Sequence, residues 1–345
     1  MLFIDGIIFT LQRSGGISVY FDELISYLNK NDHSFILNVY DNHSDNNNLK
    51  VNINKAIGSL KLESSRYFER YLDVNIPDNT TVFHSSYYRL PRKNQRSNIK
   101  IITTVHDFTY EKYGTGISKL IHCYQKKRAI LNSDEIVCIS NNTKKDLLKF
   151  IPESRNKKIS VIHNGVSEHF THDPFLSCNS DVIFIGARNG YKNFNSAVKA
   201  LIPTKLNLII IGGGVLSAEE KSFLERSLPG RFKFMGFLSD EDLVKVYNSA
   251  FCLLYPSLYE GFGIPVIEAM SCGCPVIASN SSSIPEICEE AAILCNNSTS
   301  EDIFKALESL LDERYRAKLI KKGLFRAKKF SWIKTFKKTM EIYLR

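Results

Sequence analysis

Apolar residues recur along the chain with two different spacings. Short continuous apolar runs have the length of buried strands, whereas the stretch after Gly15-Gly16 places apolar residues at 17, 20, 21, 24, 25 and 28, a helical spacing. Runs of the two kinds follow one another, which predicts alternating strands and helices and hence parallel sheets. In the first half we expect strands at 3–9, 35–40, 81–84, 100–106, 135–140 and 159–162, with helices at 15–29 and 141–149 and a polar loop at 41–48.

The pattern restarts near residue 180, after a polar, turn-rich stretch. A chain of 345 residues exceeds the size at which a single core usually keeps growing. We therefore expect two Rossmann-like α/β domains, at 1–166 and 167–327, followed by a last helix at 328–345. Strands are expected at 181–186, 206–211, 232–234, 250–255, 275–278 and 292–294, with helices at 193–201 and 301–311 and a helical tail from 317 that is interrupted at Ser331-Trp332.

Composition narrows the class of protein. A hydrophobic fraction of 43% with 23% charged residues is ordinary for a folded globular chain. No apolar run approaches the length of a membrane span. The apolar start contains Asp5 and has no basic leader, so it is interpreted as a buried strand and not as a signal peptide. The eight cysteines form no regular framework, which favours reduced thiols and a cytoplasmic location.

Positive charge is concentrated in patches, within a net charge of +9. One patch joins Arg89, Arg92, Lys93, Arg96 and Lys100, and others are Lys126-Lys127-Arg128 and Lys144-Lys145. Such patches attract phosphates of nucleic acid, membrane lipid or a substrate, although solvated surface charge explains any one of them equally well.

The segment from Leu254 to Met270 carries the most chemistry. An apolar strand leads into a loop with Glu260, Gly261 and Gly263, and Pro265 stands where a first helical turn would begin. Glycines let a ligand approach backbone N–H groups, and those groups favour a diphosphate at the start of a helix. Glu268 lies about a turn into that helix, where its carboxylate can accept hydrogen bonds from a ribose diol. Glu260 can do the same for sugar hydroxyls.

Two cations follow the first strand of the second half. Arg188 and Lys192 come directly after a strand that ends in Gly186. An arginine fork and a lysine point charge can bracket a diphosphate and stabilise the charge that grows on a leaving group. Taken alone, both could be surface charges.

The first half offers two weaker signals. Gly15-Gly16 lies between a strand and a helix, where it can be a phosphate-facing loop or merely a tight turn. His106, followed by Asp107, ends an apolar strand, and strand ends are where α/β proteins bind ligands. A histidine satisfied within a loop is the alternative.

Taken together, Glu260 and Glu268 with seven residues between them around Gly-Phe-Gly-Ile-Pro resemble the signature of retaining group-1 (family four) glycosyltransferases of GT-B fold. The resemblance implies two Rossmann-like domains facing across a donor cleft, with the last helix returning to the first domain. It also implies front-side displacement without a metal or other cofactor. By this resemblance the catalytic residues are His106, Arg188, Lys192 and Glu260, and the donor contacts are Gly15, Gly16, Arg188, Lys192, Glu260, Gly261, Phe262, Gly263, Ile264 and Glu268.

The opening residues 4–9 and 14–20, and the Gly-Tyr-Lys-Asn run, are similar to bacterial O-antigen and capsule mannosyltransferases. This resemblance implies a hexosyltransferase whose donor is GDP-mannose, with UDP-linked hexoses next. The implied acceptor is a growing glycan or a polyprenyl-diphosphate-linked sugar, reached from the cytoplasm at the inner face of the membrane. Nucleic acid is not an expected partner. Residues 41–80 match nothing in the family pattern.

Two other functions are compatible with parts of this pattern. A nucleotide-sugar epimerase could use the same architecture, and a non-catalytic binder of membrane or nucleic acid would explain the basic patches but leave the two glutamates without a role. Asp240-Glu-Asp242 has the form of a metal-binding motif but is interpreted as a helix start behind Ser239. His169, His172 and Asp173 lack further ligands nearby, so no metal site is expected.

Overall fold

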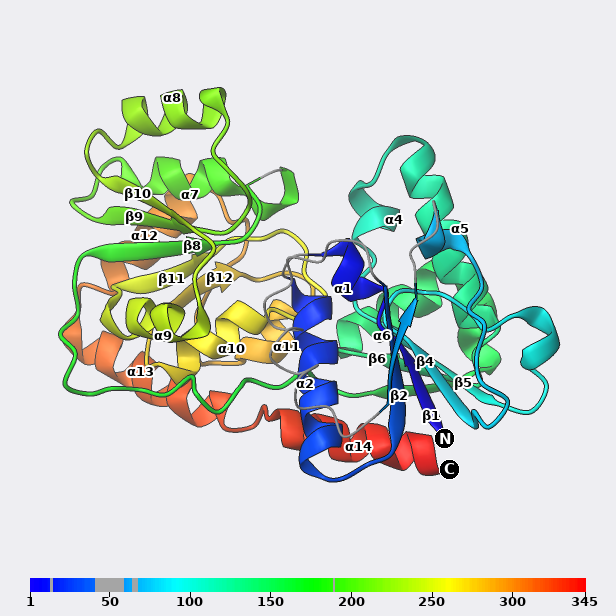
Figure 1. The fold of residues 1–345 in the computed structure, drawn as a ribbon. Coiled ribbons are helices and arrows are strands. Elements are labelled where there is room, and N and C mark those ends of the chain that lie inside the picture. Colours follow the sequence, from blue (N-terminus) through cyan, green and yellow to red (C-terminus); the bar gives the residue numbers. More distant parts are fainter. Residues whose placement is uncertain (13–14, 41–58, 64–67, 189) are drawn as a thin grey trace. The chain divides into compact units, whose positions relative to one another are not determined.

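The computed structural model describes residues 1–345 apart from 13–14, 41–58, 64–67 and 189 (Figure 1). The chain divides into two compact units. The first unit contains Met1–Asn164 together with Trp332–Arg345, and the second unit contains Gly165–Ser331. The sequence predicted the changes of domain after residues 166 and 327. The predicted loop at 41–48 lies outside the described residues, as do Arg13 and Ser14 beside the double glycine.

A parallel sheet forms the centre of the first unit. The described strands follow the order β3-β2-β1-β4-β5-β6-β7. Their bounds are β1 Leu2–Asp5, β2 Phe35–Tyr40, β3 Ser59–Glu63, β4 Val82–Ser85, β5 Lys100–Val105, β6 Glu135–Cys138 and β7 Lys158–Val161. The order reverses direction between β1 and β4. The carboxyl ends of strands at such a reversal are where open α/β sheets bind ligands.

Helices alternate with these strands, and the last helix of the chain belongs to this unit. They are α1 Ile8–Leu11, α2 Gly16–Lys30, α4 Thr109–Tyr113, α5 Gly116–Leu131, α6 Asn141–Phe150 and α14 Trp332–Leu344. Helix α14 packs against α2, where the ring of Tyr20 lies 5.9 Å from that of Trp332 and 5.5 Å from that of Phe336. The predicted return of the last helix to the first domain is therefore confirmed.

The expected strand at 3–9 is wrong in its second part. Strand β1 ends at Asp5, and Ile8 and Phe9 lie buried in the short helix α1. The chain turns at Gly6, whose N–H donates to Asn38 O at 2.8 Å; a side chain at Gly6 would place its Cβ 2.8 Å from the same oxygen. A continuous apolar run fits a buried helix as well as a strand, so periodicity alone did not separate them.

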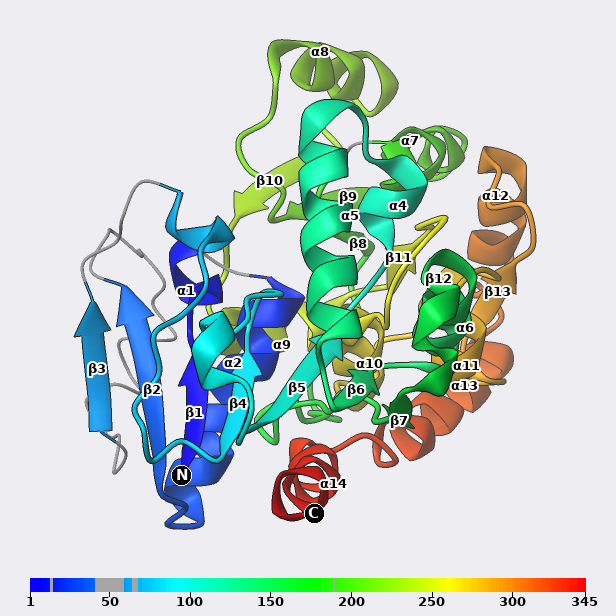
Figure 2. The ribbon, with the colours of Figure 1, turned by 90° about the vertical axis from the view of Figure 1, so that its right-hand side faces the viewer.

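The second unit repeats the architecture with its own sheet and core (Figure 2). Its strands follow the order β10-β9-β8-β11-β12-β13, all in parallel pairs. The strands are β8 Asp181–Ile185, β9 Asn207–Ile211, β10 Phe232–Gly236, β11 Cys252–Tyr255, β12 Val276–Ser279 and β13 Ile293–Cys295. The helices are α7 Phe194–Leu201, α8 Ala218–Ser227, α9 Asp240–Ser249, α10 Ile264–Ser271, α11 Ile284–Cys288, α12 Ser300–Ser309 and α13 Glu313–Ala327. The predicted pair of parallel α/β sheets is confirmed.

Helices α6 and α9 are each capped by a serine, and one of these caps is the predicted Ser239. The Ser140 hydroxyl accepts from Thr143 N–H at the start of α6, and the Ser239 hydroxyl accepts from Asp242 N–H at the start of α9. The Asp240-Glu-Asp242 run is therefore a helix start, as predicted. Among the helices that the structure describes, none combines the length and apolarity needed to cross a bilayer.

Candidate active site

The predicted donor residues of the second unit gather at the reversal of strand order. Strand β8 leads to Arg188 and Lys192, and the neighbouring strand β11 leads to Glu260. Both segments follow the carboxyl ends of their strands. Although 68 residues separate Lys192 from Glu260 in the sequence, the sheet brings them into contact.

Lys192 and Glu260 form an ion pair. Nζ of Lys192 donates to Oε1 of Glu260 at 2.6 Å, and the two side chains are 13% and 14% exposed. The ammonium also lies 5.5 Å from the ring centroids of Tyr191 and Tyr255. Burial alone would lower the pKa of Lys192, but Tyr255, Glu260 and Tyr191 outweigh it and raise the pKa above its usual value. Lys192 is therefore a fixed positive charge at the edge of the sheet.

Arg188 is engaged differently. Its Nε donates to Glu220 Oε1 at 2.9 Å, Nη1 donates to Gly212 O at 3.0 Å, and Nη2 donates to the carbonyls of Gly214 and Val215, each at 3.0 Å. Four of its five N–H groups thus donate to described residues of the same unit. The guanidinium holds the glycine turn after β9 in place. Its predicted contact with a diphosphate remains a prediction.

The Gly212–Gly214 turn is built for this close contact. All three glycines have positive φ, from 72° to 75°, a conformation that other residues rarely adopt. A Cβ on Gly213 would lie 2.6 Å from Nη1 of Arg188. The backbone of the turn after β9 therefore packs directly against the Arg188 side chain, which leaves no room for a side chain at Gly213.

Helix α10 begins at the loop that carries Glu260. Gly263 precedes it with φ of 108°, and no side chain caps the helix. A Cβ on Gly263 would lie 2.9 Å from Cδ1 of Ile284. Ile264 is the first residue of α10, and Gly261 is buried in the loop before it. The Phe262 ring is buried, with its centroid 5.7 Å from that of Phe330. Phe262 can therefore offer a sugar donor only its backbone.

Glu268 projects from α10 toward α9. Its Oε2 accepts from the Tyr247 hydroxyl at 3.2 Å. Burial, followed by the charge of Asp240, raises the pKa of Glu268 to about 8, against the opposing effects of Tyr247 and His169. This carboxyl therefore loses its proton close to neutral pH. Its predicted role as an acceptor of hydrogen bonds from a ribose diol is strongest in the deprotonated form.

The serine run at 279–283 holds the Glu260 loop. The Ser283 hydroxyl donates to Glu260 O at 3.0 Å and to Phe262 O at 2.9 Å, and the Ser282 hydroxyl accepts from Glu260 N–H at 2.9 Å. Ser282 has a φ of 54°, which is uncommon for a residue other than glycine and is typical of functional sites. The density of serines at 279–283 is the one local signal that pointed here.

In the first unit, His106 follows β5 and is buried. Its Nε2 has no hydrogen-bond partner among the described residues. Burial lowers the pKa of His106 to about 4, with Asp107 and Lys126 acting in opposite directions, so the imidazole is neutral at pH 7. A buried nitrogen without a partner is costly and is a reason to expect a ligand there.

The double glycine lies at the start of α2. Gly16 is the first residue of the helix, and Gly15 precedes it in an extended conformation, with its carbonyl accepting from the Ser18 hydroxyl at 2.9 Å. Neither glycine needs a left-handed backbone. The structure thus places both glycines at the start of α2.

Three of the five basic side chains in the stretch at 89–100 bind other residues of the first unit. Arg89 is buried, with Nη1 3.0 Å from Asp5 Oδ1 and Nη2 2.6 Å from Glu69 Oε1. Arg96 pairs with Asp73 at 2.9 Å, and Lys100 donates to Ile342 O. Arg89 therefore cannot take part in an attraction of this stretch to phosphates of membrane lipid, because its guanidinium is buried and paired with two carboxylates.

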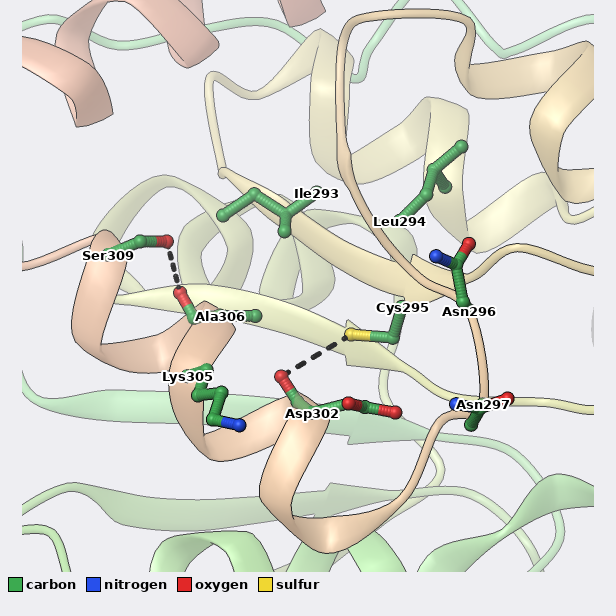
Figure 3. Close-up of a pocket in the computed structure, with 9 residues that line it drawn as sticks. All are labelled: Ile293, Leu294, Cys295, Asn296, Asn297, Asp302, Lys305, Ala306 and Ser309. Carbon is green, nitrogen blue, oxygen red and sulfur yellow. Dashed lines mark hydrogen bonds between the residues drawn. The ribbon is translucent and has the colours of Figure 1, made fainter.

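The remaining candidates do not form a second site. His169 pairs with Asp240 on the surface, and the described residues contain no cluster of three metal-ligating side chains. A cavity of about 350 Å³ lies between β13 and α12, lined by Cys295, Asn296 and Asp302 among others (Figure 3). None of its lining residues belongs to the predicted donor site.

Two successive Rossmann-like units in one chain are the architecture of the GT-B class. A model of the glycosyl transferases group 1 matches residues 177–324, and a model of glycosyltransferase family 4 matches residues 14–170. The chain therefore belongs to the group-1 glycosyltransferases of GT-B fold.

Individual relatives agree with this assignment. O-antigen chain mannosyltransferase B of Escherichia coli is 27% identical over 285 residues, which cover 76% of this chain and 74% of that protein. The serotype-specific mannosyltransferase WbdA of Escherichia coli is 36% identical over 132 residues, which are 38% of this chain but only 16% of WbdA. Sucrose-phosphate synthase from Thermosynechococcus elongatus shares the fold, with a TM-score of 0.77, 19% identity, and coverage of 99% and 98%.

Proposed function

We propose that this enzyme transfers mannose from GDP-mannose, with retention of anomeric configuration, to a growing or lipid-linked glycan in the assembly of a bacterial surface polysaccharide. The observation that carries the proposal is the Lys192–Glu260 pair at the strand-order reversal of the second unit. The mannosyl specificity draws its support from the two Escherichia coli mannosyltransferases described above.

The donor diphosphate would lie near Lys192 and the uncapped start of α10. The fixed ammonium of Lys192 and the positive end of the α10 dipole both favour negative charge there. Glu268 would accept hydrogen bonds from the ribose diol, and Glu260, already oriented by Lys192, would accept them from the mannose hydroxyls. Arg188 would act through the glycine turn after β9, which it holds by donating to Gly212 O and to the carbonyls of Gly214 and Val215.

The reaction breaks the bond between mannose C1 and the diphosphate oxygen, whose electrons leave with GDP. The acceptor hydroxyl oxygen forms the new bond to C1 on the same face, and its proton passes to the departing diphosphate. Negative charge grows on that diphosphate, so Lys192 stabilises the transition state more than the ground state. Neutral His106 would donate or accept a hydrogen bond at the transferred sugar through Nε2. No metal is part of this proposal.

The test measures GDP released from GDP-mannose, with and without a mannosyl acceptor, and with and without EDTA. We expect acceptor-dependent release that EDTA leaves unchanged, and an axial, α-configured product by NMR of its anomeric proton. UDP-glucose and UDP-N-acetylglucosamine serve as competing donors. Faster turnover of a UDP-sugar would refute the donor assignment, and inversion at C1 would refute retention. Loss of activity in EDTA would refute metal independence. Conversion of the donor without acceptor would instead indicate an epimerase.

We also propose that the enzyme works at the inner face of the cell membrane, where a polyprenyl-diphosphate-linked acceptor would be presented. Activity on a short, water-soluble acceptor would fall below that on the lipid-linked form if this is correct. Equal kcat/KM on both would contradict a lipid-linked acceptor while leaving mannosyl transfer intact.

A further inference from the structure

The imidazole of His106 is packed against two aromatic rings of α2. The ring centroid of Tyr20 lies 5.3 Å from that of His106, edge to face, with 81° between the ring planes. The ring of Phe21 lies 6.3 Å from the same imidazole. Both rings are buried, and Nε2 of His106 has no hydrogen-bond partner among the described residues. The outer torsion of a histidine side chain has no sharp preference of its own, so the direction of Nε2 depends on packing against these rings.

The last helix of the chain supports the Tyr20 ring. Trp332 and Phe336 are one turn apart on α14 and stack on each other at 5.4 Å, with 8° between their planes. The Tyr20 ring meets both of them edge to face, where α2 and α14 pack together (Figure 1). A shift of α14 along α2 would therefore move the ring that packs against His106.

A chain of hydrogen bonds joins α14 to the central sheet. The Tyr343 hydroxyl lies 2.6 Å from Nδ1 of His84, and Thr104 Oγ1 lies 2.9 Å from Nε2 of the same histidine. His84 belongs to β4 and Thr104 belongs to β5, the strand that leads directly to His106. The Phe21 ring contacts both histidines, since it also lies 5.1 Å from that of His84. Helix α14 is thus connected to the end of β5 as well as to α2.

His84 serves this connection and is closed to a substrate. Its side chain is fully buried, and both of its ring nitrogens have hydrogen-bond partners. Burial, with His106 adding to it, lowers the pKa of His84 to about 3, so the ring is neutral at pH 7. A neutral imidazole donates through one nitrogen and accepts through the other, and a hydroxyl can partner either of them. The hydroxyls of Tyr343 and Thr104 therefore satisfy His84 in its place between α14 and β5.

We propose that Tyr20 and Tyr343 are positioning residues for His106, and that the seating of α14 on the first unit thereby controls the rate of sugar transfer. This inference rests on the proposed role of His106 at the transferred sugar. Both tyrosines are buried, so they act through the imidazole and not on a substrate. A group that reaches a sugar through a hydrogen bond has to keep its geometry, and a displacement of about 1 Å can lower the rate by about 10².

The experiment uses the full chain and measures acceptor-dependent release of GDP from GDP-mannose. Tyr20→Leu removes the ring that packs against His106, whereas Tyr20→Phe keeps it. Tyr343→Phe removes only the hydroxyl at the end of the hydrogen-bond chain. The matched control is Tyr27→Leu. Tyr27 lies on the same helix and packs against the same Phe336 at 5.7 Å, but in the described part of the chain it makes no ring contact with His106.

The expected effect is on turnover and not on donor binding. Tyr20→Leu should lower kcat at least about tenfold and keep the donor KM within about twofold, because the imidazole moves while the donor contacts stay. Tyr20→Phe should restore turnover, and Tyr343→Phe should lower kcat by about three- to tenfold. Tyr27→Leu should lower the melting temperature, because packing on Phe336 is lost, but leave kcat within about twofold of the wild type.

NMR of the histidine rings follows the imidazole without any substrate. His106→Ala identifies the His106 signal by its loss. Burial lowers the pKa of His106 to about 4, with Asp107 and Lys126 acting in opposite directions, and both of these charges are the same in every variant. Between about pH 8 and about pH 5 the wild-type signal should therefore stay in place. In Tyr20→Leu water enters the space that the ring leaves, so the pKa should rise toward its usual value and the signal should titrate.

Three results would overturn the inference. The first is a folded Tyr20→Leu that keeps the turnover and the His106 signal of the wild type. The second is an equal loss of kcat in Tyr27→Leu, since loosened packing of α14 would then explain both variants. The third is wild-type turnover in Tyr343→Phe, which decides the matter if Tyr20→Leu does not fold.

The proposed function fails in a different way. Wild-type turnover in His106→Ala would remove the role on which the inference rests, and absence of GDP release by the wild type would refute mannosyl transfer. The titration of the His106 signal in Tyr20→Leu needs neither donor nor acceptor. It therefore tests the positioning of the imidazole separately from the reaction.

Discussion

Replacing Lys192 by alanine tests the centre of the proposed site. Two unit charges at the 2.6 Å separation of Lys192 Nζ and Glu260 Oε1 attract by about 6 kcal/mol at an effective dielectric constant of about 20. Desolvation of the pair offsets a large part of this, but removing one partner leaves the other charge uncompensated. We expect Lys192→Ala to lower the unfolding free energy of the second unit by about 2 kcal/mol, since both side chains keep some solvent contact.

The effect on turnover is separate and larger. Loss of a preorganised charge at a leaving group typically lowers kcat by about 10² to 10³. We expect that loss in Lys192→Ala, measured as acceptor-dependent GDP release at saturating donor. Lys192→Arg should recover part of it, because it keeps the charge with a different shape. Lys199→Ala, at an exposed lysine of α7, is the control and should match the wild type.

The double variant Lys192→Ala with Glu260→Gln separates the two effects. Without the uncompensated carboxylate, its melting temperature should recover toward that of the wild type, whereas its turnover should remain low. Turnover of Lys192→Ala within about threefold of the wild type would refute a role for Lys192 at the leaving group, since loss of such a charge lowers kcat by about 10² or more. Full recovery of turnover in the double variant would reduce Lys192 to a structural partner of Glu260.

Three further predictions follow from the same geometry. Arg188→Ala removes four hydrogen bonds, so we expect it to lower the unfolding free energy by about 2–3 kcal/mol, measured by urea denaturation. Arg188→Lys should not restore this loss. Unchanged stability would contradict the role of this side chain in holding the glycine turn. With the Glu268 pKa at about 8, the deprotonated fraction of this carboxyl grows as the pH rises toward 8. GDP affinity measured by calorimetry should therefore rise by up to about tenfold per pH unit below pH 8, and its pH dependence should be flatter in Glu268→Gln. Identical slopes in the two proteins would exclude Glu268 from GDP binding. Burial, with His106 adding to it, lowers the pKa of His84 to about 3, and burial lowers that of His106 to about 4, so the unfolded chain binds more protons below about pH 6.5. Stability should therefore be full above that pH and fall as the pH drops toward 4, with a shallower fall in His106→Asn; equal slopes in the two proteins would show that His106 is accessible to protons when folded.

Much of the fold was predictable from local patterns. Strand and helix spacing, the restart near residue 180, and the capping serines 140 and 239 depend on residues that are neighbours in sequence, so periodicity and turn chemistry report them directly. The apolar run at 3–9 was the exception. The bend at Gly6 is decided by the carbonyl of Asn38 on the adjacent strand, which no local pattern contains.

The candidate site divides in the same way. The types and spacing of Arg188, Lys192, Glu260 and Glu268 predicted which residues carry chemistry, because each follows a strand that can be recognised by itself, Glu268 one helical turn further on. Their partners could not be read from spacing. Glu220 and the glycine turn that Arg188 binds come from later in the chain, as does the serine run that holds the Glu260 loop.

The sequence by itself thus determined the class of protein and the two parallel sheets, and it predicted the residues of the donor site. Only the tertiary structure decided which charged side chains are buried and paired inside the protein and which face solvent. Arg89 and Lys126 belong to basic patches in the sequence but are buried and paired, whereas Leu120 and Tyr124 are apolar and exposed. Burial depends on how a helix is rotated against its sheet, and that rotation is set by contacts between segments far apart in the chain.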